Sequence, residues 1–289
     1  MDDSLYFTEH HHQVRETVRE FAKVHVAPVA RELDRTSSFP WDNIKKMGEL
    51  GFLGVPWSEE LGGAGMDQTS YYITIQEMAK VDASHALTIS AHTNLGTSPI
   101  VEFGTTAQRA KYVPLLASGR VLGGFGLTEP GAGSDAGGTV TTAVDKGDHF
   151  VLTGSKVFIT HAGVGEIFSV TARTDPGTGH RGISSLIVTK DTVDLDQCLR
   201  LGVGHAADLP KIANVRAGKK EDKMGWRASD TRELHFENAI VPKENMLGAR
   251  GEGFVNFLKT LDGGRIGIAA LSLGIAEGAY HAALEYAGT

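Results

Sequence analysis

The stretch FGLTEPGAGSD, residues 125–135, lies where the hydrophobic pattern of the sequence changes from helical to β-rich. On its N-terminal side apolar residues recur three or four positions apart, so that Val14, Val18 and Phe21 would form one stripe of a helix. On its C-terminal side short runs rich in Val, Ile, Thr and Phe are separated by Gly, Asp and Pro, which is typical of strands and turns. The stretch therefore marks the border between a helical part and a β part.

Four segments of the helical part have this spacing. The first begins after Thr8, which is a suitable N-cap, and the second runs from residue 41 to a glycine stop at Gly51. The third covers residues 67–82, and the fourth follows Thr106, a second candidate cap. Short glycine-containing connections join the segments. We therefore expect an all-helical N-terminal domain over residues 1–121.

The β-rich runs define a second region. HFVLTGSKVFIT, residues 149–160, predicts two short strands around a Thr-Gly-Ser turn. Three further runs, at residues 167–174, 182–190 and 231–242, predict three more strands. No helical pattern of useful length interrupts them, and parallel strands would need crossover helices. The expectation is an antiparallel β-barrel or sandwich domain over residues 122–240, in a chain of α+β class.

The pattern becomes helical again from Gly253, so residues 241–289 read as the first part of a C-terminal helical domain. Small residues recur on this long helix at Gly267, Gly274 and Gly278, which permits close packing against other helices. Its apolar face has no partner helix later in the sequence. Either the N-terminal helices cover that face or the chain is incomplete.

Composition and charge narrow the class of protein. A net charge of -7 argues against a protein that coats nucleic acid, although backbone N–H groups can still bind an anionic small molecule. The single cysteine, Cys198, excludes an internal disulfide and fits a reducing compartment, either bacterial cytoplasm or mitochondrial matrix. We expect no membrane span and no signal peptide, because the N-terminus is acidic and polar and no window is apolar enough. His10, His11 and His12 lack accompanying ligands, so no metal site is predicted.

The glycine-rich turn has several interpretations. Residues 131–136 match the G-x-G-x-x-A dinucleotide fingerprint, but no helix follows, and no Lys-Ser or Lys-Thr pair closes a P-loop. A plain turn remains, as does a wall for a flat ligand, because Thr128, Glu129 and Ser134 lie beside two glycines that admit conformations barred to other residues.

A second segment offers an aromatic ring beside a hydroxyl. Phe158 and Thr160 lie two apart on one face of a predicted strand, and a ring face next to a hydrogen-bond donor suits an isoalloxazine. Packing of Phe158 in the core is the alternative. The residues alone leave both interpretations open.

Four motifs resemble, in order, those of the acyl-CoA dehydrogenase family: LTEPGAGSD, LTGSKVFIT, KKEDKMGWRASDTRELHFENAIVP and LDGGRIGIA. The likeness extends from about Tyr6 to the last residue. It implies a helical domain, a β domain and a C-terminal helical bundle in a flavoprotein with FAD, usually a homotetramer. It also implies α,β-dehydrogenation of an acyl-CoA, with a carboxylate taking the α-proton and FAD the β-hydride, in fatty acid β-oxidation. Electron transfer flavoprotein would accept the electrons.

The resemblance also implies site residues. FAD would lie along the segment that contains Phe125, Leu127, Thr128, Gly133 and Ser134, with Leu127 and Thr128 near the pyrimidine end of the flavin. FAD would also contact Phe158, Ile159 and Thr160, with Thr160 near flavin N5. The substrate would be bound by Ser134 and by a turn at the start of the long helix, formed by Asp262, Gly263, Gly264 and Arg265.

The sequence departs from the family pattern in three places. Phe158 stands where the family commonly has tryptophan, which keeps the ring face and loses an indole N–H. His161 stands where the family often has Asn, and we expect a loop histidine without a catalytic role. Residues 193–216 add about twenty positions, which we expect to form a surface excursion, the alternative being a disturbed barrel.

The general base is a further departure from the family pattern. The family places its glutamate either in the C-terminal bundle or just before the arginine of the substrate turn, where this sequence has Gly264. We therefore expect the base C-terminal to Thr289 in a longer chain, and Glu277 and Glu285 are expected to be exposed. The alternatives are an acyl-CoA oxidase or flavin monooxygenase on the same fold, or a non-catalytic flavin-fold binding protein.

Overall fold

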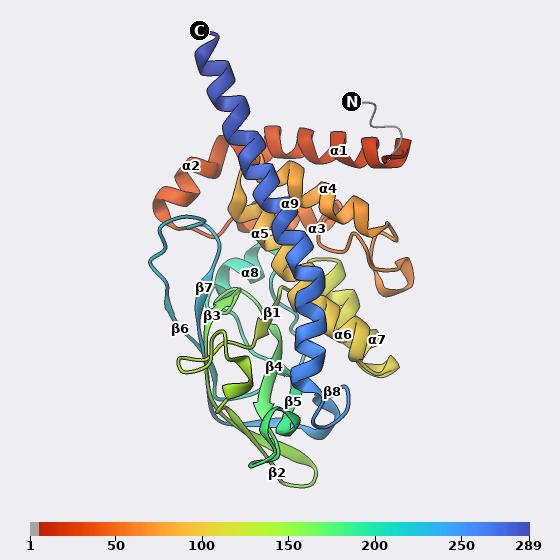
Figure 1. Cartoon of the computed structure of the whole chain (residues 1–289), viewed down its shortest axis with the longest axis vertical. Coiled ribbons are helices and arrows are strands. Elements are labelled where there is room, and N and C mark those ends of the chain that lie inside the picture. Colours follow the sequence, from red (N-terminus) through yellow and green to blue (C-terminus); the bar gives the residue numbers. More distant parts are fainter. Residues whose placement is uncertain (1–5) are drawn as a thin grey trace.

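The computed structural model describes residues 6–289, so residues 1–5 of the predicted N-terminal domain lie outside the described residues. Helices occupy one end of the molecule and the sheet the other, and the last helix runs beside both (Figure 1). The predicted order of a helical region, a β region and a C-terminal helix is confirmed. The predicted limits at 121/122 and 240/241 stay a prediction.

The N-terminal region is entirely helical. Its α-helices are α1 (Glu9–Phe21), α2 (Ala27–Thr36), α3 (Trp41–Glu49), α4 (Gln68–Ala79), α5 (Ala83–Ser90), α6 (Ser98–Phe103) and α7 (Thr106–Ala117). π-Helical segments η2 (Ala22–Val26) and η4 (Ala91–Thr97) continue α1 and α5, and η3 (Glu59–Leu61) is a 3-10 turn. Thr8 caps α1 as predicted, but the cap of α7 is Thr105, not Thr106.

Within the described residues the β region is an eight-stranded sheet with the order β6-β7-β3-β2-β4-β5-β8, and β1 pairs with β4. The strands are β1 (Gly123–Gly126), β2 (Thr142–Asp145), β3 (His149–Thr160), β4 (Ile167–Arg173), β5 (Ile183–Thr189), β6 (Val215–Lys220), β7 (Thr231–Pro242) and β8 (Met246–Leu247). Most pairs are antiparallel, as expected, but β1 and β2 run parallel to β4. Strand β1, only four residues long, was not predicted from the sequence.

Residues 149–160 form one strand, so the predicted Thr-Gly-Ser turn is wrong. Gly154 has a φ of +147° and lies at a register shift between β3 and β7. A Cβ on Gly154 would lie 2.5 Å from the Thr141 hydroxyl oxygen. The glycine therefore serves a close approach within the sheet rather than a chain reversal.

The added segment, residues 193–216, is not a surface excursion. It contains a helix, α8 (Leu195–Leu201), so the expectation that no helix interrupts the strands is also wrong. Cys198 and Val203 are buried in the same apolar cluster as Trp41, while Leu209 is buried in a separate apolar cluster. The β4–β5 ladder is continuous, so the barrel-disturbing alternative finds no support there. The sequence did not predict this packing, because α8 has only seven residues and therefore shows no helical period long enough to detect.

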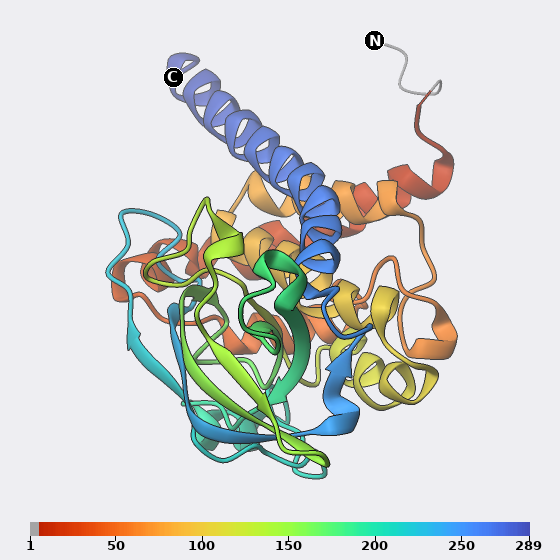
Figure 2. The same cartoon turned by 60° about the horizontal axis from the view of Figure 1, so that its bottom comes forward.

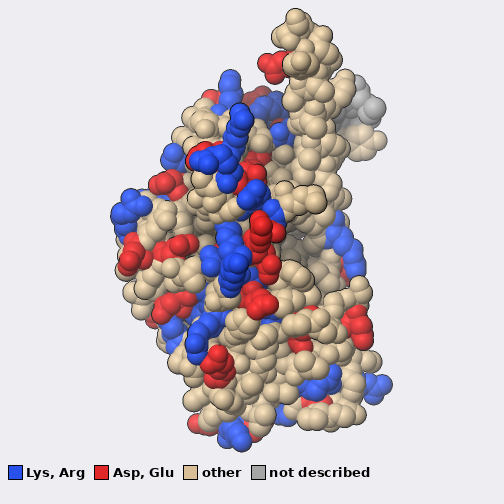
Figure 3. Space-filling model, turned by 90° about the vertical axis from the view of Figure 1, so that its left-hand side faces the viewer, with Lys and Arg blue, Asp and Glu red and all other residues tan. Residues whose placement is uncertain are grey.

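The last helix, α9 (Gly253–Ala287), packs one side against α4 and α5, so the N-terminal helices do cover part of it. A Cβ on Gly274 would clash with the Gln76 carbonyl oxygen of α4. Leu273, Leu284 and other apolar side chains of α9 are exposed. The C-terminal half projects from the body in Figure 2, and its projecting end shows few charged side chains in Figure 3.

By length and composition α9 could cross a membrane. Its most apolar 18-residue window has a mean hydropathy of 1.2, and 17% of that window is buried. The expectation that no window approaches this level is therefore wrong for α9. Core helices of water-soluble proteins pass the same test.

Candidate functional site

The residues predicted to line a flavin converge on one cavity of about 430 Å³. It lies between β1 and the loop after it, the end of β3, η4 and α9, and ligand pockets commonly have this size. Its lining residues are Ala91, Leu95, Gly124, Phe125, Leu127, Thr128, Gly133, Ser134, Ala136, Phe158, Ile159, Thr160, Leu258, Leu261 and Arg265. This set includes all eight predicted cofactor residues. No Asp or Glu is among the described residues that line it.

Phe158 is turned into the cavity by an irregularity in β3. The register between β3 and β7 shifts between Lys156 and Ile159, and Phe158 has a φ of +58°. Its side chain is 66% exposed, which excludes the core-packing interpretation. Left-handed backbone costs a non-glycine residue about 1–2 kcal/mol. Such strain beside a cavity points to a function for the exposed ring.

Several groups along the wall are available to a ligand. The hydroxyls of Thr128, Ser134 and Thr160 make no hydrogen bond within residues 6–289. A Cβ on Gly131 or Gly133 would meet nothing within 4 Å. Neither glycine has a positive φ, so the expectation of a barred conformation is wrong. Bare backbone, free hydroxyls and one exposed ring fit the planar, polar-edged flavin of FAD.

Glu129 does not face the cavity, contrary to expectation. It is 2% exposed, and its carboxylate lies 2.6 Å from the Lys156 ammonium. Its backbone pairs with Ala132 in an isolated bridge that closes the turn. The side chain therefore supports the wall from behind.

The predicted substrate turn is not a turn. Residues 262–265 lie inside α9, which continues through both glycines. Arg265 lines the cavity and forms an exposed ion pair with Asp262. A Cβ on Gly263 would lie 2.7 Å from the Asn94 side-chain oxygen, and one on Gly264 3.1 Å from its nitrogen. Because they have no side chains, the two glycines let η4 approach α9 closely. The helix continues through them without a turn.

An apolar cavity of about 350 Å³ adjoins the first one. The two share Ala91, Leu95, Leu261 and Arg265. Leu87, Ser90, Gly264 and Ile268 complete the lining of the second cavity. A ligand with a polar head and an apolar tail could therefore extend from one into the other.

His161 lies in the loop between β3 and β4, as expected, and it is fully buried there. Its Nδ1 lies 2.9 Å from the Gly123 carbonyl oxygen, and Nε2 is buried without a partner among the described residues. His92 accepts the Gly123 N–H at 3.0 Å, so the two imidazoles hold the first residue of β1 from both sides. Burial lowers the pKa of His161, and it lowers the pKa of His92 to about 3. Both side chains are therefore neutral near pH 7.

Other residues of the site were missed. Phe257 of α9 stacks on Phe125 of β1 with ring centroids 4.0 Å apart and an interplanar angle of 22°. Leu258 and Leu261 line the cavity from the same helix. The apolar stripe of α9 was visible in the sequence, but nothing local indicated that it would meet β1, more than 120 residues earlier.

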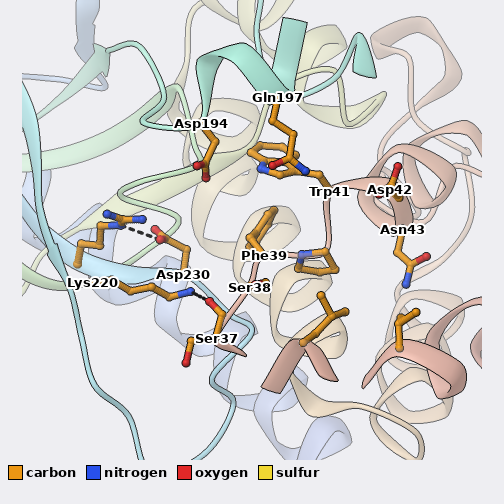
Figure 4. A pocket seen from close by; sticks show the side chains of 14 residues that line it. Ser37, Ser38, Phe39, Trp41, Asp42, Asn43, Asp194, Gln197, Lys220 and Asp230 are labelled. Atoms are coloured by element: carbon orange, nitrogen blue, oxygen red, sulfur yellow. Dashed lines mark hydrogen bonds and ion pairs between the residues drawn. The ribbon is translucent and has the colours of Figure 1, made fainter. Parts of the chain in front are cut away.

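A larger cavity, of about 490 Å³, lies elsewhere, between α3, α8 and strands β6 and β7 (Figure 4). Two of its charged groups form an ion pair, since Arg232 donates to Asp230, and Lys220 donates to the Ser37 carbonyl. None of the predicted cofactor or substrate residues lines it. Size alone therefore does not identify the site.

One group of side chains has the composition of a metal site. Ligand atoms of Glu166, Asp191 and His205 lie within 4.8 Å of one another. However, Glu166 already accepts hydrogen bonds from the Lys211 ammonium at 2.8 Å and from His205. A cation would have to compete with that ammonium.

Comparisons with known proteins agree with the geometry. Residues 8–120 match the model of the acyl-CoA dehydrogenase N-terminal domain, and residues 124–239 that of the middle domain. The short-chain specific acyl-CoA dehydrogenase of Clostridium acetobutylicum is 47% identical over 286 residues, which cover 99% of this chain and 70% of that protein.

Solved structures are similar over nearly the whole chain. Butyryl-CoA dehydrogenase from Megasphaera elsdenii has a TM-score of 0.87 at 40% identity, covering 97% of this chain and 69% of that one. A structure reported for the electron transferring flavoprotein of Acidaminococcus fermentans has a TM-score of 0.89 at 44% identity, covering 99% and 70%. An acyl-CoA dehydrogenase complexed with FAD from Bacillus anthracis has a TM-score of 0.80 at 35% identity, covering 93% and 43%.

Proposed function

This chain belongs to the acyl-CoA dehydrogenase family of FAD-containing oxidoreductases, and from that premise we propose that it dehydrogenates a short acyl-CoA to the trans-2-enoyl-CoA. The observation that supports this proposal most is the cavity in which an exposed, strained Phe158 meets the free hydroxyls of Thr128 and Thr160. When bound there, FAD would supply the acceptor for the β-hydrogen as hydride. The position of the general base stays a prediction.

The residues of the chain would bind and orient the two ligands. Phe158 offers a ring face to the flavin, and Thr160 a hydroxyl near flavin N5. The loop with Ser134 and the α9 residue Arg265 border the side from which a thioester would enter. The residues proposed to contact FAD are Phe125, Leu127, Thr128, Gly133, Ser134, Phe158, Ile159 and Thr160. Expelling water strengthens each of these hydrogen bonds.

The adjoining cavity supports an apolar tail of limited length. Leu87, Ser90 and Ile268 line it, and its volume of about 350 Å³ suits a short acyl chain. The remaining substrate contacts proposed are those of Asp262, Gly263, Gly264 and Arg265, of which Gly264 and Arg265 line the second cavity.

The proposal extends to the partners. Electron transfer flavoprotein would accept the electrons, in fatty acid β-oxidation of a bacterial cytoplasm or mitochondrial matrix. A second copy of the chain would cover the exposed apolar side of α9, consistent with the homotetramer that the family likeness implies.

The test uses a chain that contains the predicted general base. Its FAD-loaded form is mixed anaerobically with butyryl-CoA, and the flavin absorbance is followed. Thr160→Ala should lower the rate of flavin reduction on the order of 10²-fold, and substrate affinity much less, because its hydrogen bond concerns the flavin. Thr153→Ala, exposed on the same strand and outside the cavity, is the matched control and should change neither.

Three outcomes would contradict the proposal. Equal losses of rate and affinity in Thr160→Ala would remove Thr160 from the flavin site. Absence of flavin reduction by any acyl-CoA, in a chain that contains the predicted base, would refute the dehydrogenation itself. Rapid reoxidation of the reduced flavin by air would favour an acyl-CoA oxidase instead.

A further inference from the structure

A buried ion pair lies directly behind the wall of the cavity. Lys156 of β3 is 0% exposed and Glu129 is 2% exposed, and the ammonium and carboxylate are 2.6 Å apart. Neither side chain lines the cavity. A charged pair taken out of water in this way is costly unless every donor and acceptor is satisfied.

The Lys156 ammonium satisfies all three of its N–H donors. Besides the Glu129 carboxylate, it donates to the Leu127 carbonyl at 3.1 Å and to the Thr171 hydroxyl oxygen at 3.1 Å. The Thr171 hydroxyl in turn donates to the Gly126 carbonyl at 3.3 Å. One ammonium therefore ties β3 to β4 and to the two residues at which β1 becomes the loop.

The Glu129 carboxylate ties the far end of the same loop. It accepts the Val140 N–H at 2.7 Å and the Thr141 N–H at 3.2 Å. The residues between these anchors include Gly133 and Ser134, which line the cavity, and a Cβ on Gly133 would meet nothing within 4 Å. The pair thus links the two ends of the loop, beside the Arg173 guanidinium, which donates to the Gly137 and Thr139 carbonyls.

Titration agrees with this geometry. Burial lowers the pKa of Lys156 to about 8, although Glu129 counteracts it. Burial acts to raise the pKa of the Glu129 carboxyl, but Lys156 and the two backbone N–H groups outweigh it and lower the pKa. The pair is therefore ionised near pH 7.

The Leu127–Thr128 peptide links the pair to the cavity. Its carbonyl accepts the Lys156 hydrogen bond, and its Thr128 N–H has no partner within the described chain. A charged donor on a carbonyl polarises the peptide and strengthens its N–H as a donor. A ligand on this wall would meet a stronger donor than an ordinary amide.

We propose that Lys156 and Glu129 are a positioning pair for the flavin, which holds residues 127–141 in the shape that receives FAD and polarises the Leu127–Thr128 peptide toward it. The inference rests on the proposed position of FAD in this cavity. Negative charge develops on the flavin ring when it is reduced, so a stronger donor at the ring favours the reduced form.

The test compares FAD affinity and flavin midpoint potential among purified, folded variants. The double variant Lys156→Met with Glu129→Gln removes both charges while keeping an acceptor for the Val140 N–H. We expect its FAD dissociation constant to rise at least tenfold and its potential to become more negative. Lys156→Arg keeps the charge and should recover most of the affinity.

Two further variants keep the test decisive. Lys190→Met removes another buried lysine, which donates to the Gly165 carbonyl away from the loop, and it should change neither the affinity nor the potential. If the double variant does not fold, Thr171→Val loosens Lys156 without removing a charge and should weaken FAD binding by a smaller factor.

The outcomes separate this inference from the proposed function. If the double variant keeps wild-type affinity and potential, the positioning role is overturned and the cavity remains the flavin site. If the double variant does not fold, wild-type affinity and potential in Thr171→Val would overturn the role in the same way. An equal loss of affinity in Lys190→Met would also overturn it, since general destabilisation would then explain the effect. Failure of the wild-type protein to bind FAD would refute the cofactor site itself.

Discussion

At the scale of single residues, the site depends on side chains whose surroundings are set by distant parts of the chain. Phe158 is exposed only because β3 shifts its register against β7. His92 and His161 lie 69 positions apart and bond the same residue, Gly123. Their burial keeps both imidazoles neutral, so they act as fixed donors and acceptors that orient β1 toward the cavity.

The burial of His92 predicts a dependence of stability on pH. Its pKa in the folded protein is about 3, so between pH 6.5 and 3 the unfolded chain binds a proton that the folded chain does not. The free energy of unfolding should therefore fall as the pH is lowered through this window, by up to about 1.4 kcal/mol per pH unit from this group.

His92→Gln should reduce that slope, because an amide can accept the Gly123 N–H and donate to the Leu116 carbonyl without titrating. Urea unfolding between pH 7.5 and 4.5 measures it. The same substitution at exposed His10 should leave the slope unchanged. A wild-type slope in His92→Gln would disprove the assignment.

At the scale of elements, α9 joins the two regions that form the cavity. Its first turns supply Phe257 and Leu261 to the site, and its glycines allow close contact with α4 farther along. Because both contacts belong to one continuous helix, the packing of α9 against α4 constrains where Phe257 meets Phe125. The register of the contact between α9 and α4 thus affects the cavity near the N-terminal end of α9.

Gly274→Ala should therefore destabilise the protein, although alanine favours a helix by about 1 kcal/mol over glycine. The added Cβ would clash with the Gln76 carbonyl, and overpacking of this kind typically costs about 1–3 kcal/mol. Denaturant unfolding measures the change. Ser272→Ala, at an exposed position two residues earlier, should not destabilise. A gain in stability at Gly274 would show that the helices can separate freely.

At the scale of the whole molecule, the cavity exists only when four segments come together: η4, β1 with its loop, the end of β3 and α9. None of them forms a flavin-sized concavity alone. Cofactor binding should therefore be linked to global folding rather than to one region.

FAD should stabilise the protein against urea. At a free FAD concentration 100 times its dissociation constant, the free energy of unfolding should rise by about 2.7 kcal/mol, since the unfolded chain lacks the cavity. Far-UV circular dichroism with and without FAD measures the shift of the midpoint. An unchanged midpoint at saturating FAD would mean that FAD binds outside this cavity or to the unfolded chain as well.

Local patterns were sufficient for the order of the regions. Helical spacing, β-rich runs and the four family motifs predicted a helical region, a sheet and a long helix. The family motifs also named eight of the ten residues that line the cavity from β1, its loop and β3. These features depend on the periods of 3.6 and 2 residues and on short motifs, which are visible within about a dozen positions.

Only the tertiary structure decided the rest. The inward turn of Glu129, the burial of His161, the packing of α8 and the Phe125–Phe257 stack all depend on partners more than 20 residues away. The close approach of Gly263 and Gly264 to Asn94 likewise became visible only in the folded structure. A sequence specifies such contacts only through the fold as a whole, because burial and ion pairing are properties of the assembled core and not of any local segment.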